Sequence, residues 1–133
     1  MSRILITGAS GFLGSWIISS LIHRGIHVIA TDITDDHHRL DMIHPQIEDN
    51  LIDHRVCDVA DPAAVERVIE ETSPDAIIHL AALQIPTCRA NPVAGARVNV
   101  IGHINIFEAA RKFGISKIVY TSSIAARRRP CRK

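Results

Sequence analysis

The sequence predicts an α/β fold in which helices cover both faces of a parallel sheet. Strand and helix patterns alternate along all 133 residues, as they do in β-α-β crossover units. The strand candidates are nearly continuous aliphatic runs, which is typical of strands buried on both faces. A glycine-rich turn separates the first strand from the first helix. With 47% hydrophobic residues, the chain supplies one core of ordinary size, and we expect one domain over residues 1–126.

Five segments have the composition of strands. They are Arg3 to Thr7, His27 to Asp32, Asp53 to Cys57, Asp75 to Ala81 and Lys117 to Ser122. Between the second and third, residues 35–50 are polar, contain Pro45 and show a short helical pattern around Arg39 to Ile43. We expect this connection to be the least ordered one.

Three longer segments have helical signals. The first spans about Gly11 to His23, ends before Gly25 and is expected to face the core with Phe12, Leu13, Trp16, Ile17 and Leu21. The second begins with Asp61 as N-cap and Pro62, and directs Val65, Val68 and Ile69 inward. The third begins at Asn91 and Pro92 and ends at Gly114, and its expected apolar stripe is Val93, Val100, Ile104 and Phe107.

The turn after the first strand has the layout of a dinucleotide-binding loop. Gly8, Gly11 and Gly14 would allow a tight turn, a close approach of a pyrophosphate and close packing of the helix on its strand. The phosphates would then lie over free N–H groups at a helix N-terminus. A G-x-x-G-x-x-G pattern alone also fits an ordinary glycine-rich turn, but this one follows a strand and opens a helix, as the motif requires.

Asp32 strengthens the dinucleotide interpretation. It ends the second strand, 18 residues after Gly14, where a carboxylate accepts both hydroxyls of an adenosine ribose. Its charge would repel a 2′-phosphate, and no arginine follows it closely, so we expect NAD in preference to NADP. The alternative is that Asp32 is a solvent-facing strand end.

Two further strand ends have residues suited to the same ligand. Asp58 could accept a hydrogen bond from the adenine amino group while the N–H of Val59 donates to the ring, or Asp58 could cap the following turn. Leu80, Ala81 and Ala82 leave room at the carboxyl edge of the sheet, where open α/β folds bind ligands, although small residues there also suit helix packing.

These motifs resemble the N-terminal part of an extended short-chain dehydrogenase/reductase, the NAD-dependent epimerase/dehydratase family that acts largely on nucleotide sugars. The resemblance covers residues 2 to about 126. The matching segments are Thr7 to Gly14, Asp32, Asp58 and Val59, His79 to Ala82, Val98 to Gly102, and Ile118 to Ser123.

The resemblance implies a Rossmann-type doubly wound sheet in the order 3-2-1-4-5, with NAD across its carboxyl edge, and we expect this chain to be truncated before the family's sixth strand. It places Asn99 near the nicotinamide ribose and makes Ser123 the hydroxyl that hydrogen-bonds the reacting substrate oxygen. The motifs and the resemblance together assign cofactor binding to Gly8, Ser10, Gly11, Phe12, Leu13, Gly14, Asp32, Ile33, Asp58, Val59, Leu80, Ala81, Ala82, Asn99 and Thr121.

The family's Tyr-x-x-x-Lys pair is absent from this sequence. In the family the tyrosinate removes a hydroxyl proton, and the lysine lowers the tyrosine pKa and holds the ribose. Here the only tyrosine is Tyr120, within the last predicted strand, and residue 124 is Ile. We therefore expect little or no turnover from this chain. The alternative function is a non-catalytic dinucleotide-binding module that associates through the exposed edge of the fifth strand and apolar helix surface, as a homodimer or higher oligomer.

The charge distribution changes abruptly at residue 127. Residues 1–126 carry a net charge of −4, and the last seven residues carry +5. We expect residues 127–133 to be a disordered basic tail. The break favours a shifted reading frame, a gene remnant or an artificial end over a genuine short protein. The aromatic content of 4% argues against nucleic-acid binding, because no stacking platform accompanies the basic run.

Other classes of protein are disfavoured by composition. Three cysteines without paired spacing, and the lack of a signal peptide, indicate a cytoplasmic protein. No apolar run approaches the roughly 18 residues of a membrane span. The histidines lack the spacing of a zinc site, so we expect no metal.

Overall fold

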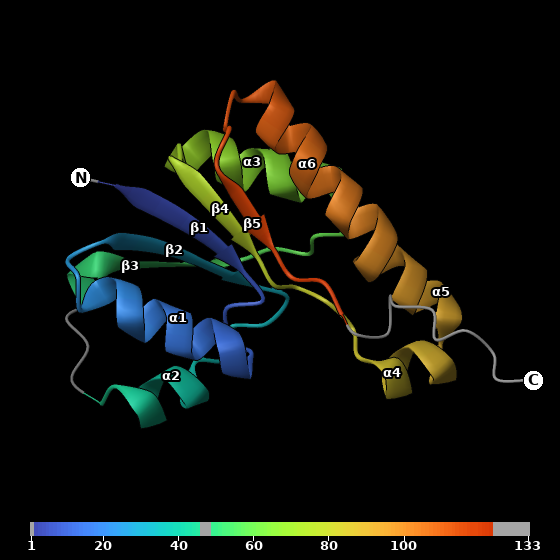
Figure 1. Ribbon diagram of the computed structural model, residues 1–133, viewed down its shortest axis with the longest axis horizontal. Coiled ribbons are helices and arrows are strands. Elements are labelled where there is room, and N and C mark those ends of the chain that lie inside the picture. The colour runs from blue at the N-terminus through green and yellow to red at the C-terminus, as the bar shows by residue number, and fades with distance from the viewer. Residues whose placement is uncertain (1, 46–48, 124–133) are drawn as a thin grey trace, which may run out of the picture.

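Five parallel strands form one sheet in the order β3-β2-β1-β4-β5 (Figure 1). The computed structural model describes residues 2–45 and 49–123. The predicted fold class and strand order are confirmed. The strands are β1 Arg3–Thr7, β2 His27–Asp32, β3 Ile52–Val56, β4 Ala76–His79 and β5 Ile118–Tyr120. The helical segments are α1 Phe12–Ile22, α2 His38–Ile43, η1 Asp49–Leu51, α3 Pro62–Thr72, α4 Ile85–Ala90, α5 Pro92–Ala96, η2 Arg97–Gly102 and α6 His103–Lys112.

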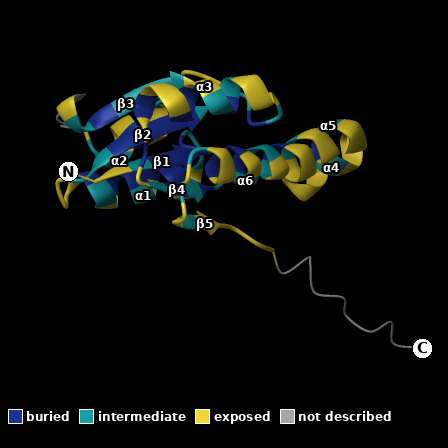
Figure 2. Ribbon diagram, turned by 90° about the horizontal axis from the view of Figure 1, so that it is seen from above, coloured by how far each residue is buried: buried dark blue, intermediate teal, exposed yellow. Residues whose placement is uncertain are grey.

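Helices cover both faces of the sheet (Figure 1). On one face, Ile6 and Val28 of the strands pack with Ile18 of α1 and Leu40 of α2. On the other face, α3 and α6 pack over alternate strand residues, among them Ile77. The buried residues follow the sheet and the inner sides of these helices (Figure 2). Because the strands alternate between two apolar layers, they read as continuous aliphatic runs in the sequence.

The register aligns the ends of four strands at one edge of the sheet. Thr7 of β1 pairs with Thr31 of β2 on one side and with His79 of β4 on the other. His79 in turn pairs with Tyr120 of β5. Since side chains alternate along a strand, these paired residues share one face of the sheet. Polar groups at the ends of neighbouring strands are thereby brought together on the α6 side.

Helix α3 forms as predicted. The Asp61 carboxylate accepts a hydrogen bond from the Ala63 N–H at 3.0 Å, and Pro62 occupies the first turn. Val65, Val68 and Ile69 are buried, and the helix ends at Ser73 in a left-handed conformation. The cap and the apolar spacing agree, which explains why this element was predictable.

The predicted inner face of α1 is wrong for three of its five residues. Phe12, Leu13 and Trp16 are exposed, with 73%, 49% and 52% of their surface accessible. Ile17 and Leu21 are partly buried and pack against the core as predicted. The buried face instead consists of Gly14, Ser15, Ile18, Ser19 and Ile22. The small residues of this face let the start of the helix lie close to the glycine turn. The larger side chains consequently point away from the sheet.

The helix that follows Asn91 also differs from the prediction. The Asn91 side chain caps it as expected, by accepting from the Ala94 N–H at 3.0 Å. The segment is divided into α5, a π-helical part η2 and α6, and the predicted stripe is largely exposed at Val93, Val100 and Ile104. Its buried residues are Gly95, Gly102, Ile106, Ala109 and Ala110. As in α1, small residues mark the side that packs.

Strands β4 and β5 are shorter than predicted, so the residues from Leu80 to Ala82 and from Thr121 to Ser123 lie beyond their carboxyl ends. The predicted basic tail, residues 127–133, lies outside the described residues. Within residues 2–45 and 49–123, every helix is too short or too polar to cross a bilayer.

Candidate functional site

The glycine turn lies against the end of β4. Gly8 has φ of +71°, in the left-handed region where side chains are strained. A Cβ at this position would lie 2.8 Å from the Ala81 backbone nitrogen and 2.9 Å from the Leu80 carbonyl carbon. Only glycine satisfies both the conformation and the space. The turn and the residues after β4 therefore form one continuous wall.

The start of α1 is open to this edge of the sheet. Gly11 is the N-cap and provides no side-chain hydrogen bond to the first turn. The first N–H groups of a helix have no partner within the helix, so they are available to an anion. Gly14 allows the close packing, because a Cβ there would lie 2.7 Å from the Ala9 carbonyl oxygen. The arrangement suits a phosphate group above the turn.

Asp32 spans the gap between β2 and the glycine turn. One carboxylate oxygen accepts from the Ser10 N–H at 3.0 Å, and the other accepts from the Ile33 N–H at 2.7 Å. These two bonds fix the carboxylate at the edge of the sheet beside the turn. Each oxygen retains a further lone pair for a hydroxyl donor. Asp32 is thus directed into the site.

A narrow groove of about 210 Å³ runs along the carboxyl ends of β1, β2, β3 and β4. Its walls contain nine of the predicted cofactor-binding residues. The groove is lined by Gly8, Gly11, Thr31, Asp32, Ile33, Cys57, Asp58, Val59, Leu80, Ala81, Ala82, Leu83 and Val98. The lining thus combines two carboxylates with apolar side chains, a surface that suits a flat ring beside a polyhydroxylated sugar.

Of the two roles that the sequence left open for Asp58, the structure shows the capping of the turn. One carboxylate oxygen accepts from the Ala60 N–H at 2.9 Å, which caps the turn before α3. The residue also lines the narrow groove beside Val59. Cys57, next to it, remains a neutral thiol, because burial and then the nearby carboxylates raise its pKa to about 11. The capping bond holds the Asp58 carboxylate at the groove without filling it.

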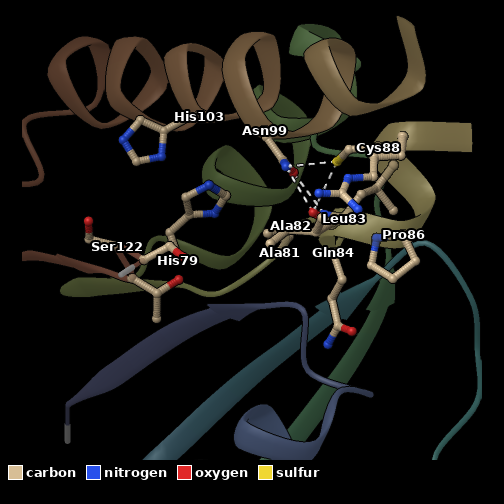
Figure 3. A pocket seen from close by; sticks show the side chains of 14 residues that line it. His79, Ala81, Ala82, Leu83, Gln84, Pro86, Cys88, Asn99, His103 and Ser122 are labelled. Atoms are coloured by element: carbon tan, nitrogen blue, oxygen red, sulfur yellow. Dashed lines mark hydrogen bonds between the residues drawn. The ribbon is translucent and has the colours of Figure 1, made fainter. Parts of the chain in front are cut away.

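A second cavity, the wide pocket, has a volume of about 740 Å³ and lies beyond β4 and β5 under α4 and α6 (Figure 3). It shares Ala81, Ala82 and Leu83 with the narrow groove. Its remaining lining residues are His79, Gln84, Ile85, Pro86, Cys88, Arg89, Asn99, His103, Thr121, Ser122 and Ser123. Three of these, Asn99, Thr121 and Ser123, are predicted site residues.

Asn99 hydrogen-bonds the backbone of Leu83, a residue that lines both cavities (Figure 3). Its Oδ1 accepts from the Leu83 N–H at 2.7 Å, and its Nδ2 donates to the Leu83 carbonyl at 2.9 Å. Nδ2 also lies 3.5 Å from the Cys88 sulfur. The residue sits in the π-helical segment η2, a kind of irregularity found frequently at functional sites. Asn99 therefore fixes the shape of the wall between the two cavities.

A match to a known protein family agrees with this geometry. A sequence model described as the NAD dependent epimerase/dehydratase family matches residues 4–127. The chain belongs to this family. The match confirms the resemblance, and the glycine turn, Asp32 and both cavities all lie within the matched residues.

Epimerases and a dehydrogenase are among the relatives of this epimerase/dehydratase-family chain. The UDP-glucose 4-epimerase of Mycolicibacterium smegmatis is 36% identical over 123 residues, which are 91% of this chain and 38% of that protein. The crystal structure of Thermus thermophilus UDP-glucose 4-epimerase in complex with NAD has a TM-score of 0.79 and 30% identity, over 91% of this chain and 37% of that one. L-threonine dehydrogenase from Clostridium difficile has a TM-score of 0.80 and 30% identity, over 95% and 38%.

This chain spans about 38% of the length of the curated relatives it matches. The relatives differ in the reactions that their names state, although they share the fold. The fold and the family are therefore established by the comparison. The reaction and the substrate depend on what the site itself supports.

Several residues of the two cavities were missed by the sequence analysis. His79, Gln84 and His103 line the wide pocket but were not predicted as site residues. For His79 a signal existed, since it ends β4 beside Thr7, and polar residues at the ends of adjacent parallel strands meet at one edge. In contrast, Phe12 and Leu13, which were predicted to bind the cofactor, are exposed in the first turn of α1.

Proposed function

We propose that this chain forms the NAD-binding half of an epimerase/dehydratase-family protein that acts on nucleotide sugars or related sugars by hydride transfer to and from NAD. The observation that carries the proposal is the placement of Asp32 beside the glycine turn, 3.0 Å from the Ser10 N–H, on the wall of the narrow groove. In this site the adenosine ribose is held by Asp32 and the pyrophosphate by the N-terminus of α1. The adenine ring lies against the apolar wall near Val59.

We propose NAD in preference to NADP. The 2′-phosphate of NADP would lie beside the Asp32 carboxylate and be repelled by it. Arg39 of α2 reaches the same turn, where its guanidinium donates to the Ser10 carbonyl at 3.0 Å. Four carboxylates between residues 32 and 41 outweigh this single cation. The local charge therefore favours two free ribose hydroxyls.

The wide pocket suits the nicotinamide end of NAD and the reacting sugar. NAD supplies the hydride acceptor when it is bound. The protein orients the two reactants, and the Ser123 hydroxyl hydrogen-bonds the reacting oxygen. The only tyrosine, Tyr120, stacks edge-on against His103 and Phe107, with ring centroids 5.1 and 5.5 Å away. We propose that this chain by itself binds NAD without turnover.

A second proposal concerns self-association. Strand β5 is an edge of the sheet, and its Val119 and Tyr120 have 63% and 53% of their surface accessible. Val100 and Ile104 add exposed apolar surface on the neighbouring helical segment. Exposed strand edges and apolar patches favour association. We propose that the chain forms a homodimer through this surface.

We also propose that the chain works in the cytoplasm, in keeping with its free thiols Cys57 and Cys88.

Calorimetric titration with NAD and with NADP tests the first proposal, and a turnover assay with a panel of nucleotide sugars follows it. We expect NAD to bind more tightly than NADP, with no turnover. A lack of NAD binding would contradict the cofactor assignment. Measurable turnover would show that proton transfer uses residues other than the family's tyrosine and lysine.

A further inference from the structure

The hydroxyl of Thr7 lies at the centre of a small hydrogen-bond network at the end of β4. Its Oγ1 accepts from the backbone N–H of Ala81 at 3.2 Å. It also accepts from the Leu80 N–H at 3.2 Å, a donor that it shares with the Thr7 carbonyl oxygen at 3.1 Å. The same oxygen lies 2.7 Å from Nδ1 of His79. A hydroxyl has two lone pairs and one proton. The two backbone donors face the lone pairs, and among the described residues the acceptor within reach of the hydroxyl proton is the imidazole.

The network therefore selects one tautomer of His79. If Nδ1 carried a proton, Thr7 would face three donors with two lone pairs, and its own proton would lack an acceptor. An accepting Nδ1 satisfies the hydroxyl proton, and the proton of the neutral ring then resides on Nε2. The side chain is almost fully buried, with 4% of its surface accessible. Burial, and secondarily the nearby His103, lowers its pKa to about 4, which keeps the ring neutral at physiological pH.

The second ring nitrogen is free for a ligand. Among the residues that the structure describes, Nε2 of His79 has no hydrogen-bond partner, and it is not among the enclosed, unpaired side-chain atoms. His79 lines the wide pocket, and its ring lies beside that of His103, with centroids 5.2 Å apart (Figure 3). The residue also stands two positions before Ala81, where the pocket meets the narrow groove.

We propose that His79 is a ligand-binding residue whose Nε2–H, fixed by Thr7, donates a hydrogen bond to an uncharged hydroxyl or carbonyl oxygen in the wide pocket. This inference rests on the proposed function, because the oxygen belongs either to the nicotinamide nucleoside of NAD or to the sugar substrate. A neutral donor of fixed direction selects a ligand by the position of its acceptor oxygen and imposes no preference for the charge of the ligand. It also keeps its proton, so it orients the ligand and takes no part in proton transfer.

The tautomer is tested first, by nitrogen-15 NMR of the histidine rings in the free protein at neutral pH. We expect His79 to show an acceptor-type Nδ1 and a protonated Nε2, and the Thr7→Val variant to lose this preference. A protonated Nδ1 in the wild-type chain would overturn the inference. This experiment needs no cofactor, so its result is independent of whether NAD binds.

Ligand binding is tested with two substitutions of opposite design. His79→Asn keeps an acceptor near Thr7 but does not reach the pocket, whereas His79→Gln extends an amide donor toward the position of Nε2. We expect His79→Asn to weaken binding by about 3- to 10-fold, as one neutral hydrogen bond is lost. His79→Gln should recover part of this loss. Melting curves of both variants report whether the fold is intact.

The ligand series identifies the acceptor. If His79→Asn lowers the affinity for NAD and ADP-ribose but not for ADP, the acceptor is a hydroxyl of the nicotinamide-side ribose. If it lowers the affinity for NAD alone, the acceptor is the carboxamide. A loss confined to UDP-glucose in the presence of NAD assigns the sugar. The inference would be overturned if His79→Asn left the affinity for all four ligands unchanged from wild type, or if it lowered the affinity for ADP as much as for the others. Failure of the wild-type chain to bind NAD would instead contradict the proposed function.

Discussion

The carboxylate of Asp32 accepts the backbone N–H of Ser10 at 3.0 Å and so joins the end of β2 to the glycine turn. In the proposed NAD site, this contact sets the distance between Asp32, which we assign to the ribose, and the glycine turn, which we assign to the pyrophosphate. The carboxylate also receives the Ile33 N–H at 2.7 Å, which fixes its orientation. The two bonds build the site before any ligand arrives, which lowers the entropic cost of binding.

Replacing Asp32 with Ala should weaken NAD binding by about 10- to 100-fold, because two hydroxyl hydrogen bonds to a charged acceptor are lost. NADP binding should change less, since the repulsion of its 2′-phosphate is removed at the same time. Calorimetry with both nucleotides measures the ratio. Asp41→Ala is the matched control, because it removes an exposed carboxylate on α2 that lines neither cavity. An equal loss in the two variants would contradict the role of Asp32.

Replacing Gly8 with Ala should destabilise the fold and abolish NAD binding. A side chain in the left-handed region costs about 1 to 2 kcal/mol, and the new Cβ would also lie 2.8 Å from the Ala81 nitrogen. Gly25→Ala is a close control, because Gly25 has φ of +68° and nothing within 4 Å of an added Cβ. Urea unfolding should therefore show a larger loss for Gly8→Ala. Equal losses would mean that the contact with Ala81 costs nothing.

The stability of the fold should fall as the pH is lowered from about 6.5 to about 4. In the unfolded chain His79 takes up a proton near its ordinary pKa of 6.5, but in the folded chain burial lowers that pKa to about 4. The unfolded state therefore binds more protons within this window, which removes about 3 kcal/mol of stability by pH 4. His79→Asn should lack this part of the pH dependence in chemical unfolding. Parallel curves for the two proteins would contradict the lowered pKa.

Replacing Val119 with Asp should convert a dimer to a monomer. The substitution places a charge on the exposed edge strand, where another chain would pair or pack. Met42→Asp introduces the same change at a residue of α2 that is 79% exposed, and it should leave the dimer intact. Sedimentation at several protein concentrations distinguishes the two states. A monodisperse wild-type monomer at high concentration would contradict association through β5.

The strands and most of the narrow groove followed from local signals, whereas the strand order came from the family resemblance. Aliphatic strands, the glycine spacing and the Asp61 cap each depend on a few neighbouring residues, and in each case the local preference agrees with the tertiary structure. Gly8 and Asp32 were identifiable for the same reason. Their roles follow from backbone conformation and from the position at which a strand ends.

The packed faces of α1 and of the helical segment after Asn91 did not follow from the sequence, in contrast to that of α3. Hydrophobic periodicity favours the largest apolar residues, so it selected Trp16 and Val100, which are exposed. The faces that pack instead use Gly14 and Gly102, where a Cβ would meet Ala9 and Val59 at less than van der Waals distance. Close approach is set by the partner surface, which periodicity does not contain. His79 was missed likewise, because its role depends on its register with Thr7.

The most direct test of the central claim is a calorimetric titration of the wild-type chain with NAD, with Asp32→Ala titrated in parallel. The account predicts saturable binding at one site per chain, weakened in Asp32→Ala. Absence of binding, or binding that Asp32→Ala leaves unchanged, would contradict the assignment of the glycine turn and Asp32 to a dinucleotide.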